Sequence, residues 1–576
     1  MNTQINKAKS ILSEYWGYPN FRPNQESVVN AVLDGKDTLA LLPTGGGKSI
    51  CFQVPAMLME GICIVVSPLI ALMKDQVAQL NNRGIRAEAL ISGISAQRLD
   101  IILDNCIYGN IKFLYLSPER LQSNLVMERI AKMKVNLIAI DEAHCISQWG
   151  YDFRPQYLNI SLIRESHPNV PLLALTATAT EIVANDIEAR LDFRTSHTIR
   201  MSFFRSNLAY MVFKEEDKLN RLLRIIRFAG GSGLVYVRSR KRTYEIANWL
   251  KKQEINADYY HAGLPRKLRD DIQERWTNGA TDLIVATNAF GMGIDKSDVR
   301  YVVHMDLPNS PEAYFQEAGR AGRDEKKAYA VLLYQQDDIQ RLEDQFLKHF
   351  PEGKEIRMIY QKLANYYQLA IGSESHQDFG FDFEDFSSKT DLDETMINHC
   401  LQALTYESYI KISSGFNKKS LIKFRSNQQQ LYSFAASSPV FESLIQHLLR
   451  KNEGIFDEFC PISEKQMASQ LNMSIKKLNG QLRQLQQVNA ISYINNQQKA
   501  RIEFLTPRQD ARFLKIDMER LRDKQKQTAK RVHAMIQYVS EDQVCRSRML
   551  LHYFDERPKT DCGQCDYCIR KNSENK

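Results

Sequence analysis

A glycine-rich segment near the N-terminus carries the residue types needed to bind phosphate. The segment PTGGGKS (43–49) lies between the apolar run LALL (39–42) and a stretch with helical character. Backbone N–H groups of such a turn, followed by a helix N-terminus, form a nest for phosphate oxygens. Lys48 would reach the β- and γ-phosphates of a nucleotide, and the Ser49 hydroxyl would hold Mg²⁺. The residues expected around the phosphates are Thr44, Gly45, Gly46, Gly47, Lys48 and Ser49.

The usual form of this motif has a further glycine at the place that Leu42 occupies here. The prediction of a phosphate-binding loop therefore rests on its position between a strand and a helix as well as on the residues of the motif.

An acidic pair ends the apolar run LIAID (137–141) and begins the segment DEAH (141–144). A carboxylate at the C-terminal end of a strand, facing a phosphate-binding loop, is where a doubly wound fold holds its metal. Asp141 would bind Mg²⁺ through water, and Glu142 would orient and deprotonate the attacking water. An isolated acidic pair is common at exposed strand ends, but its position downstream of PTGGGKS favours nucleotide hydrolysis.

Four of the ten cysteines form a C-terminal cluster with the spacing C-x16-C-x2-C-x2-C, made of Cys545, Cys562, Cys565 and Cys568. Closely spaced thiolates can surround one tetrahedral ion, of which Zn²⁺ is the first candidate and an iron–sulfur centre the alternative. Four protein ligands would make such a site structural. The other six cysteines are scattered, and no secretory signal pattern precedes them, so disulfides are not expected.

The composition is that of a globular protein with a mild positive charge. The chain has 576 residues, 43% hydrophobic and 25% charged, with a formal net charge of +8. This excludes collagen-like, mucin-like and wholly disordered chains. No stretch approaches the ~20 apolar residues of a membrane span. We expect an intracellular protein without a membrane partner, located in a bacterial cytoplasm at the nucleoid, or in the nucleus if the source is eukaryotic.

The elements that must position these residues are predicted to be two parallel α/β lobes. Buried strands of a parallel sheet read as short apolar runs. The runs in the first lobe are LALL (39–42), CIVVS (63–67), FLYLS (113–117), LIAID (137–141) and LLALT (172–176). The pattern restarts with GLVYV (233–237), ADYYH (257–261), DLIVAT (282–287) and YVVHMD (301–306). The boundary between the lobes is expected near 203–207.

The last third is predicted to hold two winged helices in tandem and a basic helix before the cysteines. A helix at 391–406 leads into a hairpin of YIKIS and SLIKF, and SIKKLNGQLRQLQQ leads into a hairpin of ISYI and RIEFL. Two unrelated α+β segments are the alternative. The expected divisions of the chain are 1–205 and 206–345 for the lobes, 346–430 and 431–508 for the winged helices, and 509–576 for a helical hairpin with the zinc module.

The basic helix at 511–539 either follows a phosphate backbone or is a solvated face. Its basic residues are Lys515, Arg520, Arg522, Lys524, Lys526, Lys530 and Arg531. In the hairpin tips, Phe416 flanked by Lys418 and Lys419 favours the first tip over the second, which carries Lys499, as a strand-separating wedge. Ordinary polar turns are the alternative.

Taken together, the motifs resemble those of the RecQ family of DNA helicases, in helicase superfamily 2. The resemblance spans residues 15 to 335. It is carried by GYPNFRPNQ (17–25), SPLIALMKDQ (67–76), SPER (117–120), CISQWGYDFRPQY (145–157), TATAT (176–180), YYHAGL (259–264), ATNAFGMGIDK (286–296) and QEAGRAGRD (316–324). The segment VCRSRMLLHYFDERPKTDCGQCDYC also resembles the family's zinc module.

The resemblance implies roles for several further residues. Tyr18 would stack on adenine, with Arg22 nearby and Gln25 reading the base edge. Trp149, Phe153 and Arg154, with His144 beside them, would couple DNA binding to hydrolysis, since aromatic and guanidinium planes stack on exposed bases. A packed aromatic cluster is the alternative. Gln316, Arg320 and Arg323 would line the cleft, with Arg323 the better arginine finger.

The function implied by the resemblance is ATP- and Mg²⁺-dependent unwinding of DNA, with 3′→5′ travel, in repair and recombination. Partners would be single-stranded and duplex DNA, and possible protein partners include single-stranded DNA-binding protein and other repair proteins. A translocase or RNA unwinder is the alternative enzyme, and a non-enzymatic DNA-binding module is the third candidate. The chain departs from the usual family order, because the winged-helix region precedes the zinc module and is duplicated.

Overall fold

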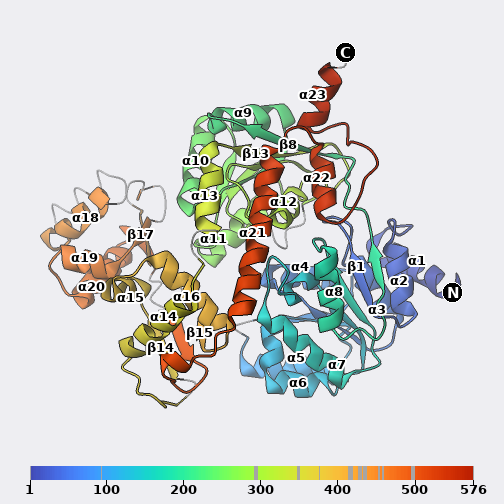
Figure 1. Cartoon of the computed structure of the whole chain (residues 1–576), viewed down its shortest axis with the longest axis horizontal. Helices are drawn as coiled ribbons and strands as arrows, with labels where there is room; N and C mark the ends of the chain where they lie inside the picture. The colour runs from blue at the N-terminus through green and yellow to red at the C-terminus, as the bar shows by residue number, and fades with distance from the viewer. Residues whose placement is uncertain are drawn as a thin grey trace. The chain divides into compact units, whose positions relative to one another are not determined.

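In the computed structural model, two separate parallel sheets form the two predicted lobes (Figure 1). The structure describes residues 2–574 except 92–93, 291–295, 347–349, 375–376, 413–419, 426–430, 432–437, 452–454, 457–459 and 495–499. Within those residues the chain divides into two compact units, 1–348 with 523–576, and 349–522. None of the helices described is long and apolar enough to cross a membrane.

The first lobe is a seven-stranded sheet of order β3-β4-β2-β5-β6-β1-β7. All its pairs are parallel, and the residues of β1, β2, β4, β5 and β6 are buried, as two-sided coverage by helices requires. Its strands are β1 Thr38–Leu41, β2 Ile62–Val66, β3 Ala87–Leu90, β4 Phe113–Leu116, β5 Val135–Ile140, β6 Leu172–Thr176 and β7 Thr198–Arg200. Its helices are α1 Asn2–Trp16, α2 Gln25–Leu33, α3 Ile50–Leu58, α4 Ile70–Asn82, α5 Ala96–Tyr108, α6 Asn124–Ile130, α7 Ile160–Ser166 and α8 Glu181–Arg190, with 3₁₀ turns η1 Pro118–Gln122, η2 Ala143–Ile146 and η3 Pro155–Asn159.

The second lobe is a six-stranded parallel sheet of order β10-β11-β9-β12-β13-β8. Its strands are β8 Leu208–Lys214, β9 Ser232–Tyr236, β10 Ala257–Tyr260, β11 Leu283–Ala286, β12 Val299–His304 and β13 Ala328–Tyr334. Its helices are α9 Lys218–Ala229, α10 Arg240–Lys252, α11 Arg266–Thr277, α12 Pro311–Ala318 and α13 Gln336–Phe346. The segment between β7 and β8 contains the expected boundary at 203–207, so the two-lobe prediction is confirmed.

The C-terminal residues return to the lobes after the winged-helix region. Three helices carry them: α21 Met518–Ser540, α22 Arg546–Tyr553 and α23 Asp566–Glu574. From Asp523 onward this module belongs to the same compact unit as both lobes. The winged-helix region is therefore an insertion in the unit formed by residues 1–348 and 523–576. This unit is called the helicase unit below, after the family that its motifs resemble. The expected division at residue 509 is wrong by this criterion, because the boundary lies within α21.

The winged-helix region contains two three-stranded sheets, but their pairing contradicts the predicted hairpins. The first sheet has the order β14-β19-β15 and the second β17-β16-β18. Strand β15 (Ile410–Ile412) pairs with β19 (Ala500–Phe504), and β16 (Ser420–Phe424) pairs with β18 (Ile491–Ile494). The two strands of each predicted hairpin therefore lie in different sheets. The remaining elements are α14 Gly353–Tyr366, β14 Gln377–Phe381, α15 Phe383–Thr390, α16 Glu394–Tyr406, α18 Pro439–Lys451, β17 Cys460–Ile462, α19 Glu464–Gln470, α20 Ile475–Gln487 and η4 Ala511–Phe513.

The two winged helices are therefore nested, one inside the other in sequence, and do not follow one another in tandem. The inner winged helix occupies 420–494 and is inserted between the last two strands of the outer one, which comprises 353–412 and 500–521. Each has its own core: one cluster contains Ile410 with Ile502, and a separate cluster contains Ile422 with Ile491. The predicted division at residue 430 is therefore wrong. Sequence pattern found the strands, but not which of two equivalent apolar partners each strand pairs with.

The start of β1, which leads to the phosphate-binding segment, is fixed by a buried carboxylate. Asp37 is 1% exposed and accepts hydrogen bonds from Arg164, from the Arg194 side chain at 2.8 and 3.0 Å, and from the backbone N–H of Leu172 at 3.0 Å. Burial alone raises the pKa of Asp37, but the two arginines outweigh it and hold that pKa below its usual value.

Replacing the inserted residues 413–499 with a short Asn-Gly turn should leave a folded protein. The turn would join β15 directly to β19, which are already paired at Ile412 and Ile502. We expect one cooperative melting transition for the helicase unit, zinc content unchanged, and hydrolysis of ATP retained. A shortened chain that is insoluble, while the isolated segment 420–494 also fails to fold, would contradict the nested arrangement.

The Asp37→Asn variant should be destabilised at pH 7 on the order of 3 kcal/mol, because two arginines lose a buried partner. The pKa of Asp37 is lowered in the folded state, so its contribution is present above the unfolded-state pKa of about 3.9 and is lost as the pH falls. Denaturant melts at several pH values should show the two proteins converging below pH ~4. A gap that persists at low pH would assign the effect to lost packing.

Candidate nucleotide site and zinc module

The phosphate-binding segment connects β1 to α3 in the conformation that its glycines permit. Gly45 and Gly47 have φ of +80° and +70°, a region that disfavours side chains. The Gln25 amide donates to the carbonyls of Gly46 and Gly47 at 3.0 and 3.1 Å, and Arg22 donates to the Gly45 carbonyl at 2.5 Å. Two of the three residues predicted around adenine therefore lie against this loop. The third, Tyr18, is 55% exposed, and its role toward the base stays a prediction.

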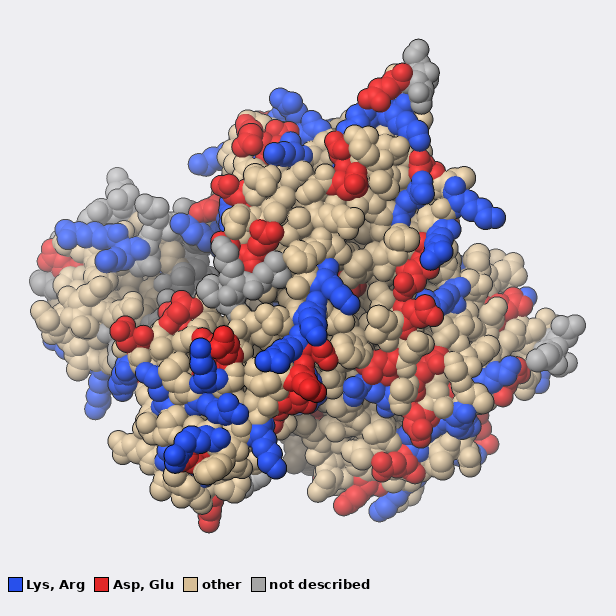
Figure 2. Space-filling view, viewed as in Figure 1, with Lys and Arg blue, Asp and Glu red and all other residues tan. Residues whose placement is uncertain are grey.

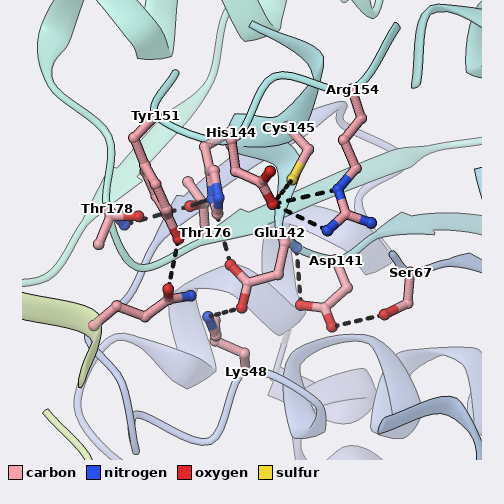
Figure 3. Close-up of polar contacts among 12 residues, drawn as sticks. Lys48, Ser67, Asp141, Glu142, His144, Cys145, Tyr151, Arg154, Thr176 and Thr178 are labelled. Atoms are coloured by element: carbon pink, nitrogen blue, oxygen red, sulfur yellow. Dashed lines mark hydrogen bonds and ion pairs between the residues drawn. The ribbon is translucent and has the colours of Figure 1, made fainter. Parts of the chain in front are cut away.

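The acidic pair lies at the end of β5, opposite the loop (Figure 3). Lys48 Nζ is 3.6 Å from Glu142 Oε1, and Asp141 accepts a hydrogen bond from the Ser67 hydroxyl at 3.3 Å. Burial, together with the Glu142 charge, raises the pKa of Asp141 to about 6. Burial also acts on Glu142, but Lys48 and His144 outweigh it and hold the pKa of Glu142 below its usual value. A buried carboxylate with a raised pKa and a nearby serine is suited to a divalent cation, which would keep Asp141 ionised.

A chain of contacts runs from Glu142 to the second lobe (Figure 3). His144 Nδ1 lies 3.4 Å from Glu142 Oε2 and 2.8 Å from the Thr176 hydroxyl. The His144 ring stacks on Tyr151 at 4.7 Å between centroids, and the Tyr151 hydroxyl donates to Gln316 Oε1 at 2.6 Å. Burial lowers the pKa of His144, against the opposing effect of the Glu142 charge.

The arginines of the second lobe lie against the same site. Gly319 accepts a hydrogen bond from the Thr44 hydroxyl at 3.2 Å, which brings the end of α12 against the phosphate loop. The Arg320 charge lowers the pKa of Glu142, and a Cβ added at Gly45 would lie 3.2 Å from Arg323 Cγ. The structure therefore brings Lys48 and Glu142 of the first lobe near Arg320 and Arg323 of the second, and their roles in hydrolysis stay predictions.

The aromatic-rich loop, residues 145–157, contains residues with different surroundings. Trp149 and Phe153 are half-buried, and Trp149 packs against the core of the lobes. Arg154 donates to Asp152 at 3.1 Å and to the Pro68 carbonyl at 3.1 Å. Sequence reasoning missed Tyr151, although it lies inside the same loop. Its hydroxyl group, which can donate a hydrogen bond where phenylalanine cannot, was the feature of the sequence that could have indicated a polar contact.

The four C-terminal cysteines meet in one cluster. Their sulfurs lie within 4.8 Å of one another, and the pairs Cys562–Cys568 and Cys545–Cys565 are 3.9 Å apart. A zinc–sulfur distance of about 2.3 Å in a tetrahedron requires sulfurs about 3.8 Å apart. The cluster thus fits a zinc ion, with all four positions filled by protein.

Three consecutive residues after α22 join the zinc module to both lobes. Phe554 packs against Phe203 of the interlobe segment and Phe315 of α12, at 5.2 and 5.0 Å between ring centroids. Asp555 accepts from the backbone N–H of Glu181, which begins α8, at 2.7 Å. Glu556 accepts from the Phe203 N–H at 2.7 Å and the Ser202 hydroxyl at 2.8 Å.

The basic helix divides into two groups of residues. Lysine and arginine side chains line α21 in Figure 2, and Arg522, Lys526 and Lys530 are exposed at intervals of four residues. Arg520 instead lies over the Tyr406 ring at 4.2 Å, and Arg531 pairs with Glu312 at 3.2 Å. Arg520 and Arg531 are thus engaged within the chain, and contact of the exposed basic residues with a phosphate backbone stays a prediction. Phe416, Lys418, Lys419 and Lys499 lie outside the described residues.

Removing one zinc ligand should affect the helicase unit and not only the C-terminus, because the module contacts both lobes. We expect Cys565→Ser to lose bound zinc, measured by atomic absorption, and to lower the melting temperature of the unit. His552→Ala, an exposed residue on the same helix α22, serves as the control. A variant without zinc that melts like the parent chain would contradict this coupling.

Family models match the chain in four places. Residues 22–187 match the DEAD/DEAH box helicase family, and 217–325 match the helicase conserved C-terminal domain. Residues 422–495 match the RecQ helicase winged-helix domain of Bacteroidota, which coincides with the inner winged helix. Residues 500–569 match the RecQ zinc-binding family.

Among solved structures, that of the DUF1998 helicase MrfA bound to DNA has a TM-score of 0.50 at 19% identity, covering 71% of this chain and 57% of that one. This likeness shows the fold alone.

Curated relatives match mainly over the two lobes. The chain is 42% identical over 357 residues to the ATP-dependent DNA helicase RecQ of Haemophilus influenzae, covering 62% of this chain and 58% of the relative's length. It is also 42% identical over 351 residues to the probable ATP-dependent DNA helicase RecS of Bacillus subtilis, covering 60% of this chain and 70% of that protein. Together with the RecQ winged-helix and zinc-binding matches, this shows that the chain belongs to the RecQ family of helicases.

Proposed function

We propose that the protein is an ATP-dependent DNA helicase that moves 3′→5′ along one strand and unwinds duplex intermediates of repair and recombination. The observation that carries this proposal is the meeting of two sets of charged residues from different lobes. Lys48 and Glu142 come from the first lobe, and Arg320 and Arg323 from the second. A site divided between two lobes converts a change in nucleotide into a change in lobe position.

The hydrolytic step is assigned to residues of this chain. Glu142 Oε2 is buried without a hydrogen-bond partner among the described residues, so it can accept one from an attacking water. Lys48 and the loop N–H groups would hold the β- and γ-phosphates. Arg323 would reach the transferring phosphoryl group as an arginine finger, with Arg320 beside Glu142. Asp141 and Ser49 would hold Mg²⁺, which supplies charge neutralisation at the phosphates.

Coupling to DNA would pass through the aromatic-rich loop. Trp149 and Phe153 are candidates for base stacking, and Tyr151 and His144 connect that loop to Gln316 and Glu142. The chain's likeness to proteins named ATP-dependent DNA helicases supports DNA as the substrate. The 3′→5′ polarity is proposed from the family resemblance of the motifs, and no distance in the site encodes it. Adenine contact by Tyr18 belongs to the same proposal. The proposed protein partners are single-stranded DNA-binding protein and other repair proteins. The proposed location is a bacterial cytoplasm.

Two substitutions separate binding from hydrolysis. Lys48→Ala should abolish ATP hydrolysis, because the phosphates lose their cation. Glu142→Gln should keep ATP binding, measured by fluorescent-nucleotide titration, and lower the hydrolysis rate by roughly 10²-fold or more, because the general base is lost. If Glu142→Gln hydrolyses ATP at the parent rate, the assignment of the base is wrong.

Strand separation is tested on short duplexes with either a 3′ or a 5′ single-stranded tail, with Lys48→Ala as the control. We expect ATP-dependent unwinding of the 3′-tailed duplex alone. Hydrolysis stimulated by DNA without unwinding of either duplex would indicate a translocase instead. Stronger stimulation of hydrolysis by single-stranded RNA than by DNA would favour an RNA unwinder.

A further inference from the structure

We propose that Arg531 of the zinc module is a positioning residue that couples nucleic-acid binding to ATP hydrolysis by fixing the aromatic-rich loop on α12. This inference rests on the proposed function and deepens it. Arg531 precedes the first cysteine of the cluster and is not one of its four candidate ligands. Its side chain is 15% exposed, and it donates two hydrogen bonds in different directions.

The two acceptors belong to different lobes. Arg531 Nη2 donates to the backbone carbonyl of Trp149, in the aromatic-rich loop of the first lobe. Arg531 Nε donates to Glu312 Oε1 at 3.2 Å, on α12 of the second lobe. The Glu312 side chain is 6% exposed, so the pair is shielded from solvent and a charge-assisted hydrogen bond there is strong. A guanidinium suits this position because its donors are held in a rigid planar fork.

The contact through Arg531 is the second of two attachments of the loop to α12. The first is direct, since the Tyr151 hydroxyl donates to Gln316 at 2.6 Å. Glu312 and Gln316 are four residues apart on α12, so they lie on one face of that helix. Trp149 and Tyr151 are likewise two residues apart in the loop. The loop is thus held at two neighbouring points, one of which the zinc module supplies.

In this arrangement Arg531 affects how nucleic-acid binding stimulates ATP hydrolysis, and takes no part in the hydrolytic step itself. The residues that surround the nucleotide, among them Lys48 and Glu142, make no contact with Arg531 among the interactions described. With Arg531 removed, the Tyr151 hydrogen bond would be the remaining one of the two attachments of the loop to α12, and the Trp149 carbonyl would lose its link to Glu312. A base stacked on the loop would then transmit its presence to α12 and Arg320 less effectively.

The test compares full-length Arg531→Ala with His533→Ala, an exposed residue two positions further along α21. ATP hydrolysis is measured at saturating ATP without DNA and with saturating single-stranded oligothymidylate. We expect Arg531→Ala to lower the DNA-stimulated kcat roughly tenfold, as loss of a buried charge-assisted hydrogen bond predicts. The DNA-independent rate, the KM for ATP and one bound zinc per chain should stay at the values of the parent chain and of His533→Ala.

Arg531→Lys provides a second measurement and should fall between the parent chain and Arg531→Ala, because an ammonium keeps the charge beside Glu312 but not the fork. If Arg531→Ala does not fold, Arg531→Lys decides by the same criterion. Full stimulation in the variants, or an equal fall of the basal and stimulated rates, would overturn the inference while leaving the helicase assignment intact. A parent chain whose hydrolysis DNA does not stimulate would overturn both.

Discussion

The packing of Phe554 between Phe203 and Phe315 is the constraint on which the helicase unit depends. Phe203 belongs to the segment between the lobes, Phe315 to α12 of the second lobe, and Phe554 to the zinc module. Phe554 is 1% exposed, and burying such a ring contributes ~1.5–3 kcal/mol. Because three separate parts of the chain meet at one cluster, the zinc module fixes the segment that joins the two lobes. A metal site without any catalytic role can therefore influence catalysis through the geometry of the lobes.

The charged groups of the nucleotide site show why the relative position of the two lobes must be fixed. Glu142, Asp141, His144 and Lys48 gather at one site. Burial and the neighbouring charges raise the pKa of Asp141 and lower the pKa values of Glu142 and His144. Such a cluster is stable only when each group has its partner in place. Some partners come from strand ends of the first lobe, and others come from α12 of the second. Small changes in lobe position thus change the electrostatics of hydrolysis directly.

Sequence reasoning predicted most of the helicase unit, because its signals are local. Apolar runs located the buried strands, and PTGGGKS and DEAH located the phosphate loop and the acidic pair. Features fixed by distant contacts escaped it. The partners of β15 and β16 depend on which of two similar strands lies closer in space, and the role of Tyr151 depends on Gln316 in the other lobe. The basic pattern of α21 could not separate Arg531, which faces Glu312, from the exposed lysines on the same helix.

The long separation in sequence between Phe203 and Phe554 has a consequence for synthesis. A ribosome that adds ~5–20 residues per second completes the first lobe and Phe203 about 20–70 s before Phe554 emerges. During that interval Phe203 and Phe315 lack the ring that covers them in the finished protein. The inner winged helix, whose strands lie within one continuous segment, can close its sheet earlier than the outer one, which must wait for β19. The nascent chain therefore exposes the apolar surface of Phe203 and Phe315 until Phe554 has been made.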